Sequence, residues 1–124
     1  MNKKELKQKL EKKIDTVLKQ YEYNWNEEIQ RREHPYIIKL KEIEKQLFSK
    51  NKDNCINAVK RLDSLLLSLR AWEDGYYDAF WDTSDKYKDK FVDGFNNWDE
   101  WYDFLKSIVE DAKKYCELSN GDKQ

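Results

Sequence analysis

Apolar side chains recur at steps of three and four along most of the chain, which is the spacing of one face of an α-helix. The longest of these stripes comprises Trp72, Tyr76, Phe80, Tyr87, Phe91, Phe95, Trp98, Tyr102, Leu105, Val109, Ala112 and Cys116, with Thr83 in one slot. A row of aspartates lies two positions further along, at Asp74, Asp78, Asp82, Asp85, Asp89 and Asp93. Because two positions turn a helix by about 200°, the aromatic and acidic side chains are expected on opposite faces.

The length of 124 residues predicts one domain, residues 1–124. The stripes predict helices at 2–33, 35–49, 54–74, 76–93 and 97–119 and a tail at 120–124. Asn2 is a candidate N-cap of the first helix, and Pro35 suits the first position of the second. Asn97, with Glu100 three residues on, predicts a capping box at the last helix. Three Gly and one Pro leave little material for a turn-rich β fold. The expected class is all-α, a small bundle of four to five helices with a long N-terminal amphipathic helix.

Charge divides unevenly between the two halves of the chain. Residues 1–61 contain 16 Lys and Arg against 10 Asp and Glu, a net of +6, whereas residues 62–124 contain 8 against 15, a net of −7. Such asymmetry indicates halves that fold against each other or that face different partners.

The two cysteines, Cys55 and Cys116, match neither a Cys-x-x-Cys motif nor a zinc-site spacing. The first residues are charged and form no signal-peptide core. No apolar run reaches the roughly 20 residues of a membrane span. We therefore expect two free thiols in a reducing cytosol and no membrane association. A bias toward Lys, Asn and Tyr suggests AT-rich coding DNA, as in a low-GC bacterium or its phages.

Motifs for catalysis are scarce. The chain has no glycine-rich phosphate loop, nucleophile elbow or His-Glu-x-x-His motif, and its one histidine, His34, lies at a predicted helix break. An alternative comes from the acid pairs Asp82-x-x-Asp85 and Glu100-x-x-Asp103, which resemble the Mg²⁺ ligands of helical nucleoside triphosphate pyrophosphohydrolases. They depart from that family because its first pair is normally glutamates on an unbroken helix. We expect no catalysis, no cofactor and no bound metal.

The acidic and aromatic rows predict a surface that binds another protein. From Glu73 to Asp103 there are ten acids and three lysines, a local net charge of −7. Carboxylates spaced along a helix can substitute for phosphates, and Tyr and Trp are typical interface anchors. Three aromatic residues, Tyr77, Trp81 and Trp101, lie at the margins of the aromatic stripe. We expect partner contacts from seven residues: Asp74, Asp78, Asp82, Asp85, Asp89, Tyr77 and Trp81.

This surface character resembles that of barstar-like inhibitors, although barstar is an α/β protein and no motif is shared. The predicted function is that of a non-catalytic inhibitor or immunity-type protein, encoded by a phage or mobile element. Its partner would be a nuclease or defence protein with a basic nucleic-acid-binding cleft. The simpler interpretation is that the aspartates form only the solvated face of a helix.

Two other classes of function use the N-terminal helix. A structural adaptor would pair two copies in a coiled coil through the apolar stripe from Leu6 to Ile29, giving a homodimer. Direct binding of nucleic acid would use the lysines of the same helix. This second class is disfavoured, because acids are interspersed among the lysines and arginines are few.

Overall fold

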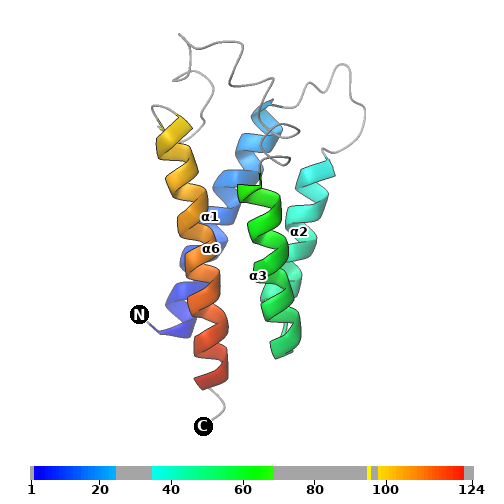
Figure 1. Ribbon diagram of the computed structural model, residues 1–124, viewed down its shortest axis with the longest axis vertical. Coiled ribbons are helices and arrows are strands. Elements are labelled where there is room, and N and C mark those ends of the chain that lie inside the picture. Colours follow the sequence, from blue (N-terminus) through cyan, green and yellow to red (C-terminus); the bar gives the residue numbers. More distant parts are fainter. Residues whose placement is uncertain (1, 25–34, 69–94, 96–97, 122–124) are drawn as a thin grey trace.

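The computed structural model describes residues 2–24, 35–68, 95 and 98–121, and these form four helices (Figure 1). They are α1 (Lys3–Asn24), α2 (Pro35–Leu47), α3 (Lys52–Leu67) and α6 (Trp98–Gly121). Helix accounts for 91% of the described residues, and none of them lies in a strand. The expected all-α bundle with a long N-terminal helix is confirmed.

The four helices run alternately up and down, and each packs against the next (Figure 1). Contacts between α6 and α1 close the ring. The alternation brings the end of α3 beside the start of α6, and the start of α3 beside the end of α6. We call the end of the bundle that holds the α2–α3 turn, residues 48–51, the disulfide end, and the opposite end the far end.

The core follows the apolar stripe of α1. In α6 it contains the later part of the predicted stripe and residues beside it, whereas Tyr102 of the predicted stripe is half-buried. Helix α1 buries Leu6, Leu10, Ile14, Val17 and Tyr21, and α6 buries Trp101, Leu105, Ile108, Val109, Ala112, Tyr115 and Cys116. Helix α3 adds Cys55, Ala58, Val59, Leu62, Leu65 and Leu66. Burial of one Leu, Ile or Phe side chain contributes about 1.5–3 kcal/mol, so these stripes supply the main driving force for folding.

Side-chain caps fix where α1 and α3 begin. The backbone N–H of Glu5 donates to Oδ1 of Asn2 at 2.8 Å, and Nδ2 of Asn2 donates to Oε1 of Glu5 at 2.9 Å. Asn2 therefore caps α1, as predicted. Asn51 caps α3 in the same way, because its Oδ1 accepts a hydrogen bond from the backbone N–H of Asn54 at 3.0 Å.

Several helix boundaries differ from the predicted ones. Helix α3 begins at Lys52 because the cap is Asn51, and it ends at Leu67, where Ser68 turns to an extended backbone with φ −72° and ψ 149°. Helix α2 ends at Leu47, two residues before the predicted position. The predicted helix at 76–93, the end of the first predicted helix after residue 24, and Asn97 of the predicted capping box lie outside the described residues. None of α1, α2, α3 and α6 combines the length and hydropathy that a membrane-spanning helix requires.

Candidate functional site

The seven residues predicted to contact a partner all lie between Asp74 and Asp89, outside the residues that the structure describes. The structure describes the helices on either side of them. Helix α3 ends at Leu67 and α6 begins at Trp98, and these two helix ends lie at the far end of the bundle (Figure 1). The two helices that flank the acid–aromatic segment, residues 72–93, therefore meet at one end of the molecule.

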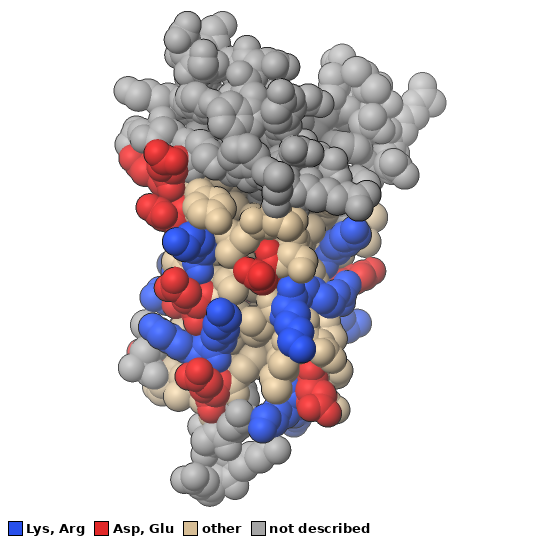
Figure 2. Space-filling model, viewed as in Figure 1, with Lys and Arg blue, Asp and Glu red and all other residues tan. Residues whose placement is uncertain are grey.

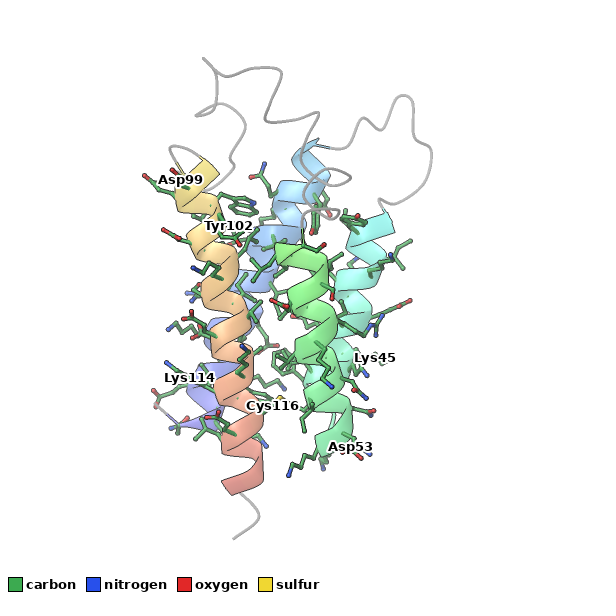
Figure 3. All side chains as sticks on the ribbon, viewed as in Figure 1. Lys45, Asp53, Asp99, Tyr102, Lys114 and Cys116 are labelled. Atoms are coloured by element: carbon green, nitrogen blue, oxygen red, sulfur yellow. A yellow bond between two sulfur atoms is a disulfide. The ribbon has the colours of Figure 1, made fainter. Side chains whose placement is uncertain are left out.

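Exposed acids occupy the start of α6 at this far end. Asp99, Glu100 and Asp103 are exposed on the first two turns of the helix. Figure 3 shows Asp99 directed away from the bundle, and Figure 2 shows acidic atoms gathered over this part of α6. Negative charge near a helix N-terminus is also favoured by the helix dipole. The described part of the acid-rich region thus presents its carboxylates to solvent.

An aromatic cluster lies beneath these acids. The ring of Phe95 packs edge-on against Trp101, with 5.0 Å between centroids, and Phe104 lies 5.0 Å from Phe95 and 5.5 Å from Trp101. Trp101 has no exposed surface. The sequence placed Trp101 at the margin of the aromatic stripe, but the structure makes it a core residue. It is therefore not available as an anchor for a partner.

The apolar stripe of α1 also lies inside the bundle. Ile14 is 1% exposed and Val17 is fully buried, and the stripe from Leu6 to Tyr21 faces the other three helices. Trp25 and Ile29, which would extend it, lie outside the described residues. A coiled coil between two folded copies would need this stripe on the surface, so the adaptor alternative loses the residues on which it rested.

Three lysines of α1 contact α6 or the turn between α2 and α3. Nζ of Lys3 lies 5.6 Å from the centre of the Tyr115 ring, and Nζ of Lys7 lies 5.2 Å from that of Phe48. Nζ of Lys13 donates to Oγ of Ser107 at 2.9 Å and to Oδ2 of Asp111 at 2.8 Å, both on α6. These cation–π and polar contacts hold α1 against the bundle. They give these three lysines a structural role, whereas Lys4 and Lys12 of the same helix are exposed.

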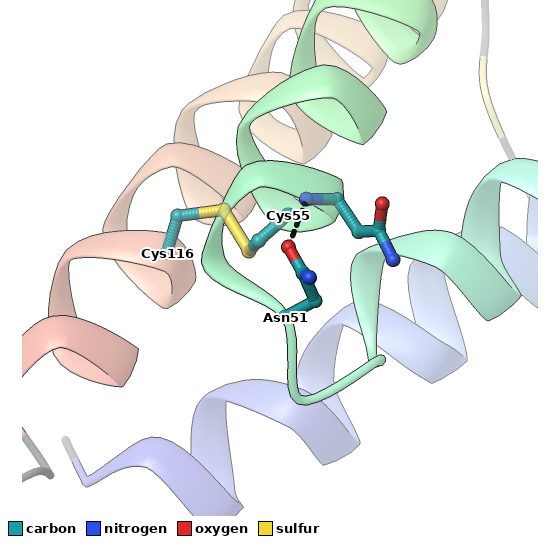
Figure 4. Close-up of a disulfide and its surroundings, with 4 residues drawn as sticks. Asn51, Cys55 and Cys116 are labelled. Carbon is teal, nitrogen blue, oxygen red and sulfur yellow. Dashed lines mark hydrogen bonds between the residues drawn. A yellow bond between two sulfur atoms is a disulfide. The ribbon is translucent and has the colours of Figure 1, made fainter.

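A disulfide joins Cys55 of α3 to Cys116 of α6, with 5.8 Å between their Cα atoms (Figure 4). The expectation of two free thiols is therefore wrong. The up-and-down topology brings the start of α3 beside the end of α6, and both cysteines face inward, with exposures of 2% and 7%. A disulfide is not the state expected of two thiols in a reducing cytosol, so the predicted location loses support.

One feature of the sequence could have indicated the disulfide, namely the position of each cysteine on the apolar face of its helix. Cys55 lies in the same helical register as Val59 and Leu62, and Cys116 lies four residues after Ala112. Each cysteine thus occupies a core position near a helix end. In an antiparallel arrangement of the third and last helices, these two positions come together.

The described part of the chain shows no cluster of side chains suited to a metal ion. Residues 2–24, 35–68, 95 and 98–121 contain no group of three or more His, Cys, Asp or Glu side chains arranged to hold an ion. Glu100 and Asp103 form one of the two acid pairs of the pyrophosphohydrolase alternative, and both are exposed. Asp82 and Asp85, the other pair, lie outside the described residues.

Comparison with protein-family models, with curated proteins and with solved structures finds no match to this chain. The functional conclusion therefore rests on the chemistry and placement of its own residues.

Proposed function

We propose that this protein is a non-catalytic inhibitor of the immunity type, which binds a basic nucleic-acid-binding cleft of a nuclease or defence protein. One observation carries the proposal. The 14 residues from Trp72 to Asp85 contain five acids and five aromatic residues, and no Lys, Arg or His. Ordinary protein surfaces intersperse charges of both signs. An anionic and aromatic segment of this kind suits a partner that normally binds phosphates.

The acids and the aromatics have different roles in this proposal. Asp74, Asp78, Asp82, Asp85 and Asp89 supply negative charge that draws a basic partner into encounter and pairs with its Lys and Arg. Tyr77 and Trp81 supply apolar area that is buried in the complex and slows dissociation. This division predicts that salt weakens association chiefly through the acids.

The described part of the bundle supports the proposal in one respect. Asp99, Glu100 and Asp103 are exposed at the start of α6, at the end of the bundle where the helices flanking the acid–aromatic segment meet. These carboxylates add to the negative charge that a partner approaching the far end would encounter. Their contribution falls off beyond a Debye length of about 8 Å at physiological ionic strength, so they act only on a partner bound close by.

The proposal includes a cytoplasmic location and a phage or mobile-element origin, because nucleases and defence proteins act where nucleic acid is accessible. A disulfide in such a compartment must form or persist against a reducing thiol pool. A coiled-coil adaptor is disfavoured as a second function, because the α1 stripe that it needs is buried from Leu6 to Tyr21.

The proposal is tested by affinity capture from a low-GC bacterial lysate, with and without nuclease treatment. The bait is the wild type or a variant in which Asp78, Asp82 and Asp85 are replaced by Asn. The control variant replaces the exposed residues Asp15, Asp53 and Asp63 by Asn, which gives the same change of net charge on α1 and α3.

We expect wild type and control to capture a basic nucleic-acid enzyme, with or without nuclease treatment, and the segment variant to lose it. Capture that is equal for both variants would contradict the proposed role of the segment. Capture that is lost after nuclease treatment would show that nucleic acid bridges the two proteins.

A further inference from the structure

A groove at the disulfide end lies between α3 and α6 and leads to the disulfide from one side. Its lining residues are Ile56, Val59, Lys60, Lys113, Cys116 and Glu117. Ile56 is 39% exposed, which is unusual for a large apolar side chain in the described part of this bundle. Cys116 lines the groove and is 7% exposed, whereas Cys55 is 2% exposed and is not part of the lining. Of the two cysteines, Cys116 is therefore the one that can be approached from this groove.

Attack at one sulfur makes the other cysteine the leaving group. Cys55 is the fourth residue of α3, is 2% exposed, and its backbone N–H already donates to the carbonyl oxygen of Asn51 at 3.1 Å. Attack from the groove at Cys116 therefore releases Cys55.

Charge at the groove favours an anionic nucleophile. Lys60 and Lys113 lie on its two sides, one on each helix, and Glu117 is its one acid. A thiolate that enters the groove is attracted by the two ammonium groups. The lining and the charge of the groove therefore both favour attack at Cys116.

We propose that Cys116 is the site of attack at which a dithiol opens the disulfide, and that Cys55 is the leaving thiolate. In the first step one thiolate of the dithiol bonds to Sγ of Cys116, the bond between the two protein sulfurs breaks, and its electron pair stays on Cys55. In the second step the other thiol of the reductant loses its proton and attacks the mixed disulfide, which releases Cys116 as a thiolate. Both cysteines are then protonated, the reductant has become a cyclic disulfide, and two electrons have passed to the protein.

Opening the disulfide removes the covalent link between the start of α3 and the end of α6. The closed loop that it removes spans a sequence separation of 61 residues and includes the whole acid–aromatic segment. This inference goes beyond the proposed function, because the exchange reaction needs no binding partner and is tested without one.

The experiment uses glutathione as the probe, because it carries no second thiol on the same molecule, so its mixed disulfide is resolved more slowly and can be trapped early in the reaction. The folded, oxidised wild type is exposed to glutathione at several concentrations, quenched with acid, alkylated and digested. Mass spectrometry then compares the glutathione adduct at Cys116 with that at Cys55.

We expect at least about tenfold more adduct at Cys116 than at Cys55, and an initial rate proportional to the glutathione thiolate concentration. Equal adducts, or an excess at Cys55, would overturn the assignment. A rate that does not depend on glutathione would also overturn it, because the disulfide would then open only after the bundle unfolds.

Charge at the groove is tested by a matched pair of variants on α6. Lys113→Glu changes a groove residue, and Lys114→Glu changes its exposed neighbour, which does not line this groove. We expect Lys113→Glu to slow adduct formation by about threefold to tenfold, and Lys114→Glu to have a smaller effect. Equal slowing by the two variants would show that only net charge matters and would remove the groove from the mechanism.

Discussion

Lys13 of α1 and Asp111 of α6 form an ion pair that is largely shielded from solvent, with 2.8 Å between Nζ and Oδ2 and side-chain exposures of 19% and 9%. Nζ of Lys9 lies 3.7 Å from the same carboxylate oxygen. Oγ of Ser107 accepts a hydrogen bond from Lys13 and donates one to the carbonyl oxygen of Phe104 at 2.6 Å. The polar groups of this contact thus satisfy one another, and they fix the position of α1 along α6.

Removal of one partner from this pair should destabilise the bundle. We expect Asp111→Ala to lower the free energy of unfolding by about 2–4 kcal/mol, because Lys13 is then left charged and shielded without its carboxylate. Replacement of both partners by apolar residues, Lys13→Met with Asp111→Leu, should change the free energy of unfolding little, because it leaves no unpaired charge. Urea denaturation followed by circular dichroism measures both effects.

An exposed ion pair on α1 provides the control. Nζ of Lys19 lies 3.1 Å from Oδ2 of Asp15, and the two side chains are 60% and 59% exposed. Asp15→Ala should change the free energy of unfolding by no more than about 0.5–1 kcal/mol, because water screens the pair. Equal losses of unfolding free energy for Asp15→Ala and Asp111→Ala would contradict the claim that shielding from solvent makes the Lys13–Asp111 pair matter more.

Loss of the disulfide should also lower stability. A chain-entropy estimate for a loop of this length gives about 4 kcal/mol, and measured effects of disulfides are about 2–4 kcal/mol. We expect the double variant Cys55→Ala with Cys116→Ala to lose an amount in that range. Wild type measured with dithiothreitol should lose a similar amount, and unchanged stability in the reductant would contradict a structural role for the bond.

Glu44 of α2 should make the stability of the bundle depend on pH. Its pKa is raised from the usual value of 4.5 because burial disfavours the charged form, with further increases from Glu11 and Asp15 of α1, while Lys7 opposes them. Below the pKa of the unfolded chain, Glu44 is protonated in both states and has no effect. As pH rises through the raised pKa, the folded state must ionise a carboxyl that the unfolded chain ionises more readily, so stability falls.

The variant Glu44→Gln isolates this effect. We expect it to be more stable than wild type at pH 7, and the difference to disappear below about pH 4, where both forms are neutral. Thermal denaturation across this range measures the difference. Glu42→Gln, on the exposed side of the same helix, is the control, and a Glu44→Gln variant that follows wild type at every pH would contradict the prediction.

Substitutions at buried positions of α1 test whether its apolar stripe serves folding or self-association. Ile14→Glu and Val17→Glu each place a carboxylate in the core, so we expect losses of at least about 3 kcal/mol and a large fall in helix content. Gln8→Glu, at an exposed position of the same helix, should fold as wild type does. Circular dichroism and sedimentation equilibrium measure both properties. A folded Ile14→Glu monomer derived from a wild-type dimer would restore the coiled-coil alternative.

The core could be predicted from the sequence because burial follows helical periodicity. Leu10, Ile14 and Val17 of α1 recur at steps of four and three, and all three are buried in the bundle. The end of α3 could not be predicted in the same way. The apolar stripe continues past Leu66 to Leu69 and Trp72, and no Gly or Pro interrupts it, yet the helix ends at Leu67 before an extended Ser68.

Contacts between distant residues escaped prediction because they depend on which helices are neighbours. Lys13 and Asp111 are 98 residues apart, and Cys55 and Cys116 are 61 apart. At the candidate site, the burial of Trp101 could not be predicted from the sequence either. A large aromatic side chain suits both a core and an interface, so its type alone did not show that it is buried.

The most direct test of the proposed function is competition between this protein and DNA for the basic enzyme that affinity capture identifies. The apparent dissociation constant of the complex is measured at increasing DNA concentration and at two salt concentrations. We expect the dissociation constant to rise in proportion to DNA, and to rise with salt less steeply for the Asp78, Asp82 and Asp85 to Asn variant than for wild type. A complex that forms equally well on DNA-bound enzyme would contradict the claim that the acid–aromatic segment occupies the nucleic-acid cleft.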